Sequence, residues 1–120
     1  MSVYLTHRVR DPFSKISTTE LCELRRDRCE CCGGNVWNLG GPEANHCLVP
    51  DRKRHKPVCD YLINIELVCH KCHVWEEVHT FYHRIAFRRK QEERYSVADV
   101  EAFFRMLDSL GYMSDGIAEA

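Results

Sequence analysis

Two cysteine pairs constrain this chain more than any other feature. Cys29 and Cys32 form a C-x-x-C pair followed by two glycines, and Cys69 and Cys72 form a second pair. The pairs are separated by 36 residues, a spacing typical of one tetrahedral zinc site that joins distant parts of a chain. We therefore expect one structural zinc ion (Zn²⁺), bound by these four thiolates.

The expected location of the protein favours metal binding over disulfides for its cysteines. The 120 residues include 8 cysteines, a content that a secreted disulfide scaffold would also show. The N-terminal run MSVYLTHRVRDPF has no apolar signal-peptide segment, so we expect a cytoplasmic, reducing location. No stretch approaches the ~18 apolar residues of a membrane span, so no membrane partner is expected.

Three cysteines compete for the two positions of the first pair. Cys29 and Cys32 have the two-residue bridge that a zinc knuckle needs, and Gly33 can take the positive φ that follows it. Cys31 is therefore expected to stay outside the site. Cys22 is expected to pack beside Leu21 as a small apolar side chain.

Local patterns predict helices on both sides of the cysteine pairs. Ser17 and Glu20 have capping-box spacing and predict a short helix that leads into the first pair. An apolar helical pattern without Gly or Pro runs from the second pair to about Glu93. A last helix, with an apolar stripe, begins at Ser96 and ends at Gly111.

Extended segments are predicted between the pairs. They are residues 36–39, 44–49 and 61–68, with a polar, basic loop at 51–60. The chain order is then a knuckle, two strands and a helix whose first turn returns two ligands to the same zinc. This order predicts a single small α+β domain on a zinc-stabilised treble clef, with an N-terminal helix and C-terminal helices.

The charge is unevenly distributed. The net charge is −1, but residues 1–98 hold 16 Lys and Arg against 13 Asp and Glu, and residues 99–120 hold one Arg against five acids. Two basic clusters lie in the body, residues 52–56 and the stretch Arg84, Arg88, Arg89 and Lys90. Each cluster alone is equally well explained as a solvated face. As DNA contacts we select Arg52, Lys53, Arg54, Lys56, Arg88 and Arg89.

The order of the motifs resembles the zinc-containing branch of the HNH endonucleases. The resemblance covers about residues 21–78. It is carried by the run LRRDRC before the first pair, His46 at the end of an extended run, Asn64 shortly before the second pair, and His73 directly after it. It implies a ββα-metal core within an HNH-like domain at 17–94, preceded by an arm (1–16). A C-terminal helix with a frayed acidic tail would follow, packed on the same domain (95–120).

The resemblance also implies a function. A metal-dependent DNA endonuclease, of the kind that phages and other mobile elements encode, would hydrolyse phosphodiester bonds with His46 as general base. Asn64 would orient that histidine or its loop, and His73 would bind a weakly held Mg²⁺ or Mn²⁺ ion. The chemistry agrees, since a neutral imidazole is well suited to accept a proton from water near neutral pH.

One position departs from the family pattern. Before the base the family usually has an acidic residue or a histidine that binds the catalytic ion, but this chain has Asn45, a weaker ligand for a hard cation. Glu77, four residues after His73 on the same helix face, is the candidate that supplies the missing charge. The competing hypothesis is a catalytically weak or inactive treble-clef zinc module that binds nucleic acid or a protein partner.

Other interpretations stay open at this stage. His73 could replace Cys72 at the zinc, His46 could be a buried structural histidine, and Asn64 could simply form a turn or cap. The apolar stripe of the last helix either covers its own core or forms a homodimer. A second zinc is also conceivable, with the ligands Cys47, His55 and Cys59.

Overall fold

The computed structural model describes residues 11–112 of the chain. Most of the expected N-terminal arm and the end of the acidic tail therefore lie outside the described residues. The described part is a small α+β fold with five α-helices and one two-stranded antiparallel sheet, as expected from the sequence. No helix within this part is long and apolar enough to cross a membrane.

The elements follow one another in a simple order. The α-helices are α2 (Thr18–Leu24), α3 (Lys56–Cys59), α4 (His70–Val78), α5 (Thr80–Arg94) and α6 (Val97–Ser109). The strands are β1 (Pro42–His46) and β2 (Ile65–Cys69). Three short 3-10 helices connect them, η1 (Val36–Asn38), η2 (Lys53–His55) and η3 (Leu62–Asn64).

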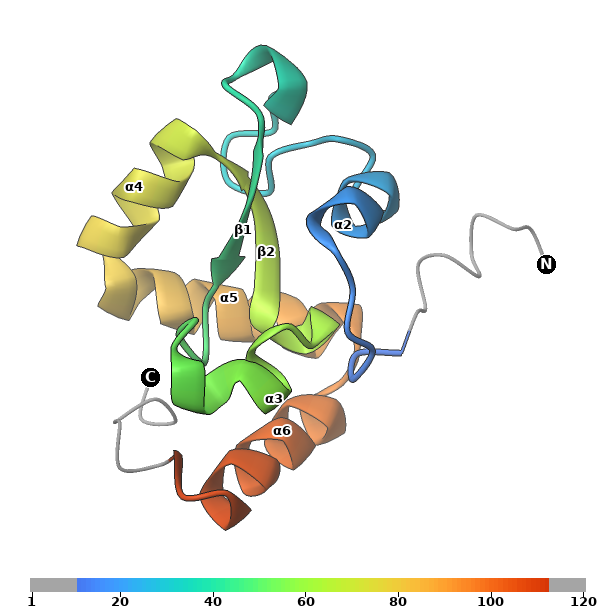
Figure 1. The fold of residues 1–120 in the computed structure, drawn as a ribbon, viewed down its shortest axis with the longest axis vertical. Coiled ribbons are helices and arrows are strands. Elements are labelled where there is room, and N and C mark those ends of the chain that lie inside the picture. The colour runs from blue at the N-terminus through green and yellow to red at the C-terminus, as the bar shows by residue number, and fades with distance from the viewer. Residues whose placement is uncertain (1–10, 113–120) are drawn as a thin grey trace, which may run out of the picture.

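The β1–β2 ladder forms the centre of the molecule. Its register pairs Pro42 with Cys69 and Asn45 with Glu66. Helix α4 lies along one side of the ladder and α2 along the other (Figure 1). Because β2 runs directly into α4, this register fixes where the second cysteine pair meets the rest of the chain.

Two predicted helix starts are confirmed. Ser17 accepts a hydrogen bond from the Glu20 amide at 3.1 Å, and the Glu20 carboxylate accepts one from the Ser17 amide at 3.0 Å, which completes the capping box of α2. Ser96 caps α6 in the same way through the Asp99 amide at 3.0 Å. Gly111, with φ of 80°, follows the end of α6.

The predicted extended segment at 36–39 is wrong, and the one at 61–68 is confirmed only in part, because strand β2 begins at Ile65. Residues 36–38 form η1, because the Asn35 side chain accepts a hydrogen bond from the Trp37 amide at 2.9 Å and turns the chain. Leu62 and Ile63 belong to η3 rather than to a strand. Their apolar character reflects burial in the core, since both are 0% exposed.

The single long helix predicted after the second cysteine pair is also wrong. It is divided at His79 into α4 and α5. The His79 ring nitrogen Nδ1 lies 2.8 Å from the Trp75 carbonyl oxygen, and Thr80 donates its hydroxyl to the Glu77 carbonyl oxygen at 2.6 Å. The Thr80 hydroxyl satisfies a carbonyl that a continuous helix would use, whereas the Trp75 carbonyl also keeps its helical bond from the His79 amide at 3.1 Å. The break lets α5 turn across the ladder (Figure 1).

Two apolar clusters form the core. The first surrounds the paired cysteines and includes Leu21, Cys22 and Leu67, so the expected packing of Cys22 is confirmed. The second joins Phe87 of α5 to the apolar stripe of α6, including Phe103 and Leu107. The stripe of α6 therefore covers its own core, and the last helix packs on the same domain.

Candidate functional site

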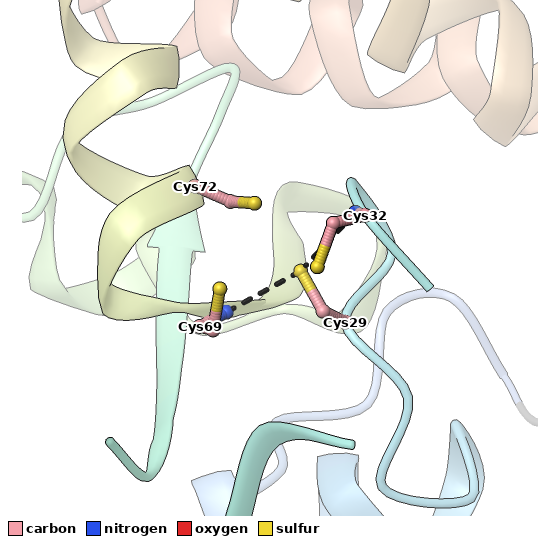
Figure 2. Close-up of side chains that lie close together, drawn as sticks. All are labelled: Cys29, Cys32, Cys69 and Cys72. Carbon is pink, nitrogen blue, oxygen red and sulfur yellow. Dashed lines mark hydrogen bonds between the residues drawn. The ribbon is translucent and has the colours of Figure 1, made fainter. Parts of the chain in front are cut away.

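The four paired cysteines form a cluster that could hold a metal ion such as zinc. Their sulfur atoms all lie within 4.8 Å of one another. They come from the loop after α2 and from the β2–α4 junction, and they converge on one point (Figure 2). Four cysteine ligands from two C-x-x-C pairs are the usual donor set of a structural zinc.

The main chain around the first cysteine pair forms a tight turn and donates hydrogen bonds to the Cys29 sulfur. Gly33 has φ of 78°, as the knuckle requires, and its amide donates to the Cys29 carbonyl at 2.8 Å. The Cys29 sulfur accepts hydrogen bonds from the amides of Cys32 at 3.5 Å and Cys69 at 3.4 Å (Figure 2). Amide donors of this kind stabilise a thiolate, the form that binds metal. Cys31 is exposed and outside the four-residue cluster, as expected.

A pocket of about 430 Å³ collects four of the residues expected to act in catalysis. His46 and Asn45 reach it from β1, and His73 and Glu77 reach it from α4. These residues are widely separated in sequence and meet because α4 lies against the ladder. His73 turns into this pocket and toward carboxylates, and Cys72 completes the four-cysteine cluster.

His46 is oriented by a carboxylate. Its Nε2 lies 2.9 Å from the Asp60 Oδ1, and its side chain is 16% exposed at the pocket. A histidine held through one ring nitrogen presents the other to a ligand. Asp60 carried no recognisable signal in the sequence, since it lies 14 residues from its partner in a polar loop.

His73 lies between two carboxylates. Its Nδ1 is 2.7 Å from the Glu43 Oε1, and its Nε2 is 3.3 Å from the Glu77 Oε1. The hydrogen bond from His73 lowers the pKa of the Glu43 carboxyl, so Glu43 is the anionic partner that fixes the ring. A histidine whose Nδ1 is held by a carboxylate directs its Nε2 lone pair outward, an arrangement common among metal ligands.

Asn64 does not line the pocket. It is fully buried, and its side-chain oxygen accepts from the amides of Leu48 at 2.8 Å and Val49 at 2.7 Å. Its amide nitrogen donates to the carbonyls of Val49 at 2.9 Å and Cys59 at 2.7 Å. Asn64 thus fastens the loop that leaves His46, which is the second of the two roles considered for it.

A buried acidic pair lies at the pocket, which one of its members, Glu76, lines. Glu66 and Glu76 are each 2% exposed, and the Asn45 amide donates to the Glu76 Oε1 at 2.8 Å. Burial, together with the neighbouring Glu66 carboxylate, raises the pKa of Glu76. Lys90 forms an ion pair with the Oε2 of Glu66. Asn45 therefore connects the pocket to this pair.

The basic residues selected as DNA contacts fall into two groups. Those of the loop are exposed and follow Pro50 and Asp51, which line the pocket. Lys56 is paired with Asp51. On α5, Arg88 lies 3.6 Å from the Glu92 carboxylate and over the Phe104 ring, and it does not line the pocket, nor does Arg89.

Arg84 is the basic residue of α5 that lines the pocket. Its Nε is buried and has no hydrogen-bond partner among the described residues. Arg84 belongs to the basic stretch of the sequence but is not among the residues expected as DNA contacts. The signal was present, because Arg84 lies one helical turn before Arg88 on the same face.

The second zinc set considered from sequence is not brought together. His55 is fully buried, and its Nδ1 lies 3.1 Å from the Pro50 carbonyl oxygen. The other two residues lie in different clusters. Cys59 lies near His46 and Asp60, and Cys47 lies near Glu66 and His83. The alternative of Cys47, His55 and Cys59 as joint ligands is therefore wrong.

Comparison of the chain with family models, curated proteins and solved structures found no match. Conclusions about function consequently rest on the cysteine cluster and on the pocket.

Proposed function

We propose that this chain is a metal-dependent DNA endonuclease of the HNH type, built on a zinc-stabilised treble clef. The observation that supports this function best is the pocket. It combines an imidazole oriented by a carboxylate, a second imidazole between carboxylates, and a guanidinium without a carboxylate partner among the described residues. Phosphodiester hydrolysis needs a base, a cation at the phosphate and positive charge for the backbone.

His46 is the proposed general base. Asp60 accepts the Nε2 hydrogen, which leaves the lone pair on Nδ1 to take a proton from the attacking water. The Asp60 carboxylate also stabilises the imidazolium that then forms, as the carboxylate of a catalytic triad does. Asn64 acts as a positioning residue, because it fixes the loop after His46 through four main-chain hydrogen bonds.

His73 and Glu77 are the proposed ligands of the catalytic divalent ion. The separation of 3.3 Å between His73 Nε2 and Glu77 Oε1 fits two ligands of one metal, and Glu43 behind His73 is the orienting carboxylate. An imidazole and carboxylate oxygens suit Mn²⁺ or Mg²⁺. Such an ion, when bound, would polarise the scissile phosphate.

Arg84 and the basic loop are the proposed phosphate contacts. A buried guanidinium nitrogen without a partner is costly unless a ligand satisfies it, and a phosphate accepts from a guanidinium in the geometry that arginine offers. The exposed Arg52, Lys53 and Arg54 follow the pocket edge directly and would hold the flanking backbone. Arg88 and Arg89 would contact the duplex farther along α5.

The test is cleavage of a supercoiled plasmid with Mg²⁺ or Mn²⁺. We expect His46→Ala to lower the cleavage rate by roughly 10²- to 10⁴-fold, because a general base contributes that much. DNA binding and zinc content should not change. Glu101→Ala is the control, since Glu101 is exposed on α6 and does not line the pocket. Equal cleavage by wild type and His46→Ala would contradict this assignment.

A second candidate is the weak or inactive zinc module that binds nucleic acid or a protein. It is favoured by Asn45, because this position has a neutral amide in place of a charged metal ligand. That amide donates a hydrogen bond to Glu76. It is also favoured by exposed apolar side chains around the α4–α5 break, Trp75, Val78, Phe81 and Tyr82. If wild type stays inert at every ion concentration while Asn45→Asp cuts, this second function replaces the first.

A further inference from the structure

We propose a second metal site, separate from the four-cysteine cluster, in which Cys47, Glu66 and His83 bind a borderline transition ion such as Zn²⁺. The three residues come from the end of β1, from β2 and from α5. Their Sγ, carboxylate oxygen and ring nitrogen all lie within 4.8 Å of one another. This site does not depend on the proposed endonuclease activity.

The distances match a tetrahedral ion. The Cys47 Sγ lies 3.4 Å from the His83 Nε2, and that nitrogen lies 3.3 Å from the Glu66 Oε1. Zinc bonds of ~2.0–2.3 Å in tetrahedral geometry give ligand separations of roughly 3.3–3.8 Å. Two edges of a coordination tetrahedron are therefore already formed.

Glu66 supplies an independent indication of a ligand. Its side chain is 2% exposed, and its Oε1 is buried without a hydrogen bond within the described part of the chain. Lys90 pairs with the other oxygen, Oε2, which leaves Oε1 available to a metal ion. The His83 Nε2 lies 3.3 Å from this oxygen without forming a hydrogen bond to it, and a cation bound between the two atoms would explain an oxygen buried in this way.

His83 is oriented as metal-binding histidines are. The Glu76 Oε2 lies 3.4 Å from the His83 Nδ1, on the side of the ring away from Cys47 and Glu66. Asn45 holds the other Glu76 oxygen at 2.8 Å. A carboxylate behind the histidine fixes the tautomer in which Nε2 is the ligand, and such partners raise metal affinity.

The donor set selects the class of ion. One thiolate, one imidazole and one carboxylate suit zinc or a similar transition ion, whereas Mg²⁺ and Ca²⁺ prefer oxygen ligands alone. Cys47, Glu76 and His83 line the pocket, so an ion has a route to the site. A water or a substrate atom from the pocket could complete the coordination.

Metal content tests the proposal. Protein purified with zinc should hold two zinc ions per chain after dialysis, and Cys47→Ser and His83→Gln should each hold one. The matched control is Cys22→Ser, another buried cysteine that belongs to no metal group and should keep two ions. Retention of two ions by Cys47→Ser or by His83→Gln would overturn the proposal.

Cobalt titration of wild type gives a second test that requires no variant. Absorption should saturate at two equivalents of Co²⁺, one with the intense charge-transfer band of four thiolates and one with the weaker band of a single thiolate. Saturation at one equivalent, or a second ion without any thiolate band, would contradict the site. Neither readout involves DNA cleavage, so an inactive protein can still confirm or overturn it.

Discussion

Asn64 is a fully buried side chain whose four hydrogen bonds all reach main-chain groups. The bonded groups belong to residues 48, 49 and 59, on both sides of the basic cluster at 52–56. A single amide thus closes the segment between β1 and β2 and fixes the direction in which the chain leaves His46.

We therefore expect Asn64→Ala to destabilise the fold by about 3–5 kcal/mol, because two amides and two carbonyls lose partners in a buried place. Urea unfolding followed by circular dichroism measures this change. Asn38→Ala, at an exposed position of η1, should change stability by less than about 0.5 kcal/mol. A loss below about 1 kcal/mol for Asn64→Ala would show that water replaces the amide.

At the scale of elements, Glu30 connects the cysteine knuckle to β2 and α5. Its Oε2 accepts from the Leu67 amide at 2.6 Å, and its Oε1 lies 2.8 Å from the Arg94 guanidinium and 3.4 Å from the Lys90 ammonium. The Glu30 side chain is 6% exposed. Three elements therefore depend on one carboxylate. Without it, Arg94 and Arg25, whose Nε lies 3.5 Å from the Glu30 Oε1, would lose this carboxylate partner, whereas Lys90 would keep Glu66.

Glu30→Ala should cost about 3–5 kcal/mol of unfolding free energy, since removal of one member of a buried ion pair leaves uncompensated charge. Zinc content should be measured on the same samples, because Glu30 follows the ligand Cys29. The control is Glu23→Ala on the exposed face of α2. If Glu30→Ala keeps both its stability and its zinc, water solvates the cationic side chains in place of Glu30, and the expectation is contradicted.

For the whole molecule, the cysteine cluster and the first apolar cluster are one unit. Cys29, Cys69 and Cys72 pack with Leu21 and Ile65 in this cluster. Strand β2 also carries Glu66, which contacts His83 and Lys90 of α5. Small domains of this size bury a modest core, so a metal bound by this cluster would contribute much of the folding free energy.

Removal of zinc should therefore unfold the ladder and α4, because a structural zinc contributes roughly 10–16 kcal/mol in small zinc domains. Cys69→Ser should have the same effect, while Cys31→Ser, at an exposed cysteine outside the cluster, should not. Amide hydrogen exchange along β1 and β2 measures the loss. A zinc-free Cys69→Ser protein with wild-type protection would contradict a structural role for the metal.

Features decided by residues close together could be read from the sequence. The spacing of each cysteine pair, the capping box of Ser17 and Glu20, and the apolar stripe of α6 all need only one or two turns of chain. The fold class and the cysteine cluster followed from these local patterns. The helix break at His79 did not, because it depends on a side-chain bond, from the Thr80 hydroxyl, to a carbonyl that a continuous helix would use.

The tertiary structure alone decided which side chains meet. Asp60 beside His46, Glu43 beside His73, and Glu66 beside Cys47 and His83 are separated by 14 to 36 residues and share no local pattern. Their contacts follow from the ladder register and from the turn between α4 and α5. Residue types and spacing determined which ligands and bases this chain contains, and only packing in three dimensions decided how they are paired.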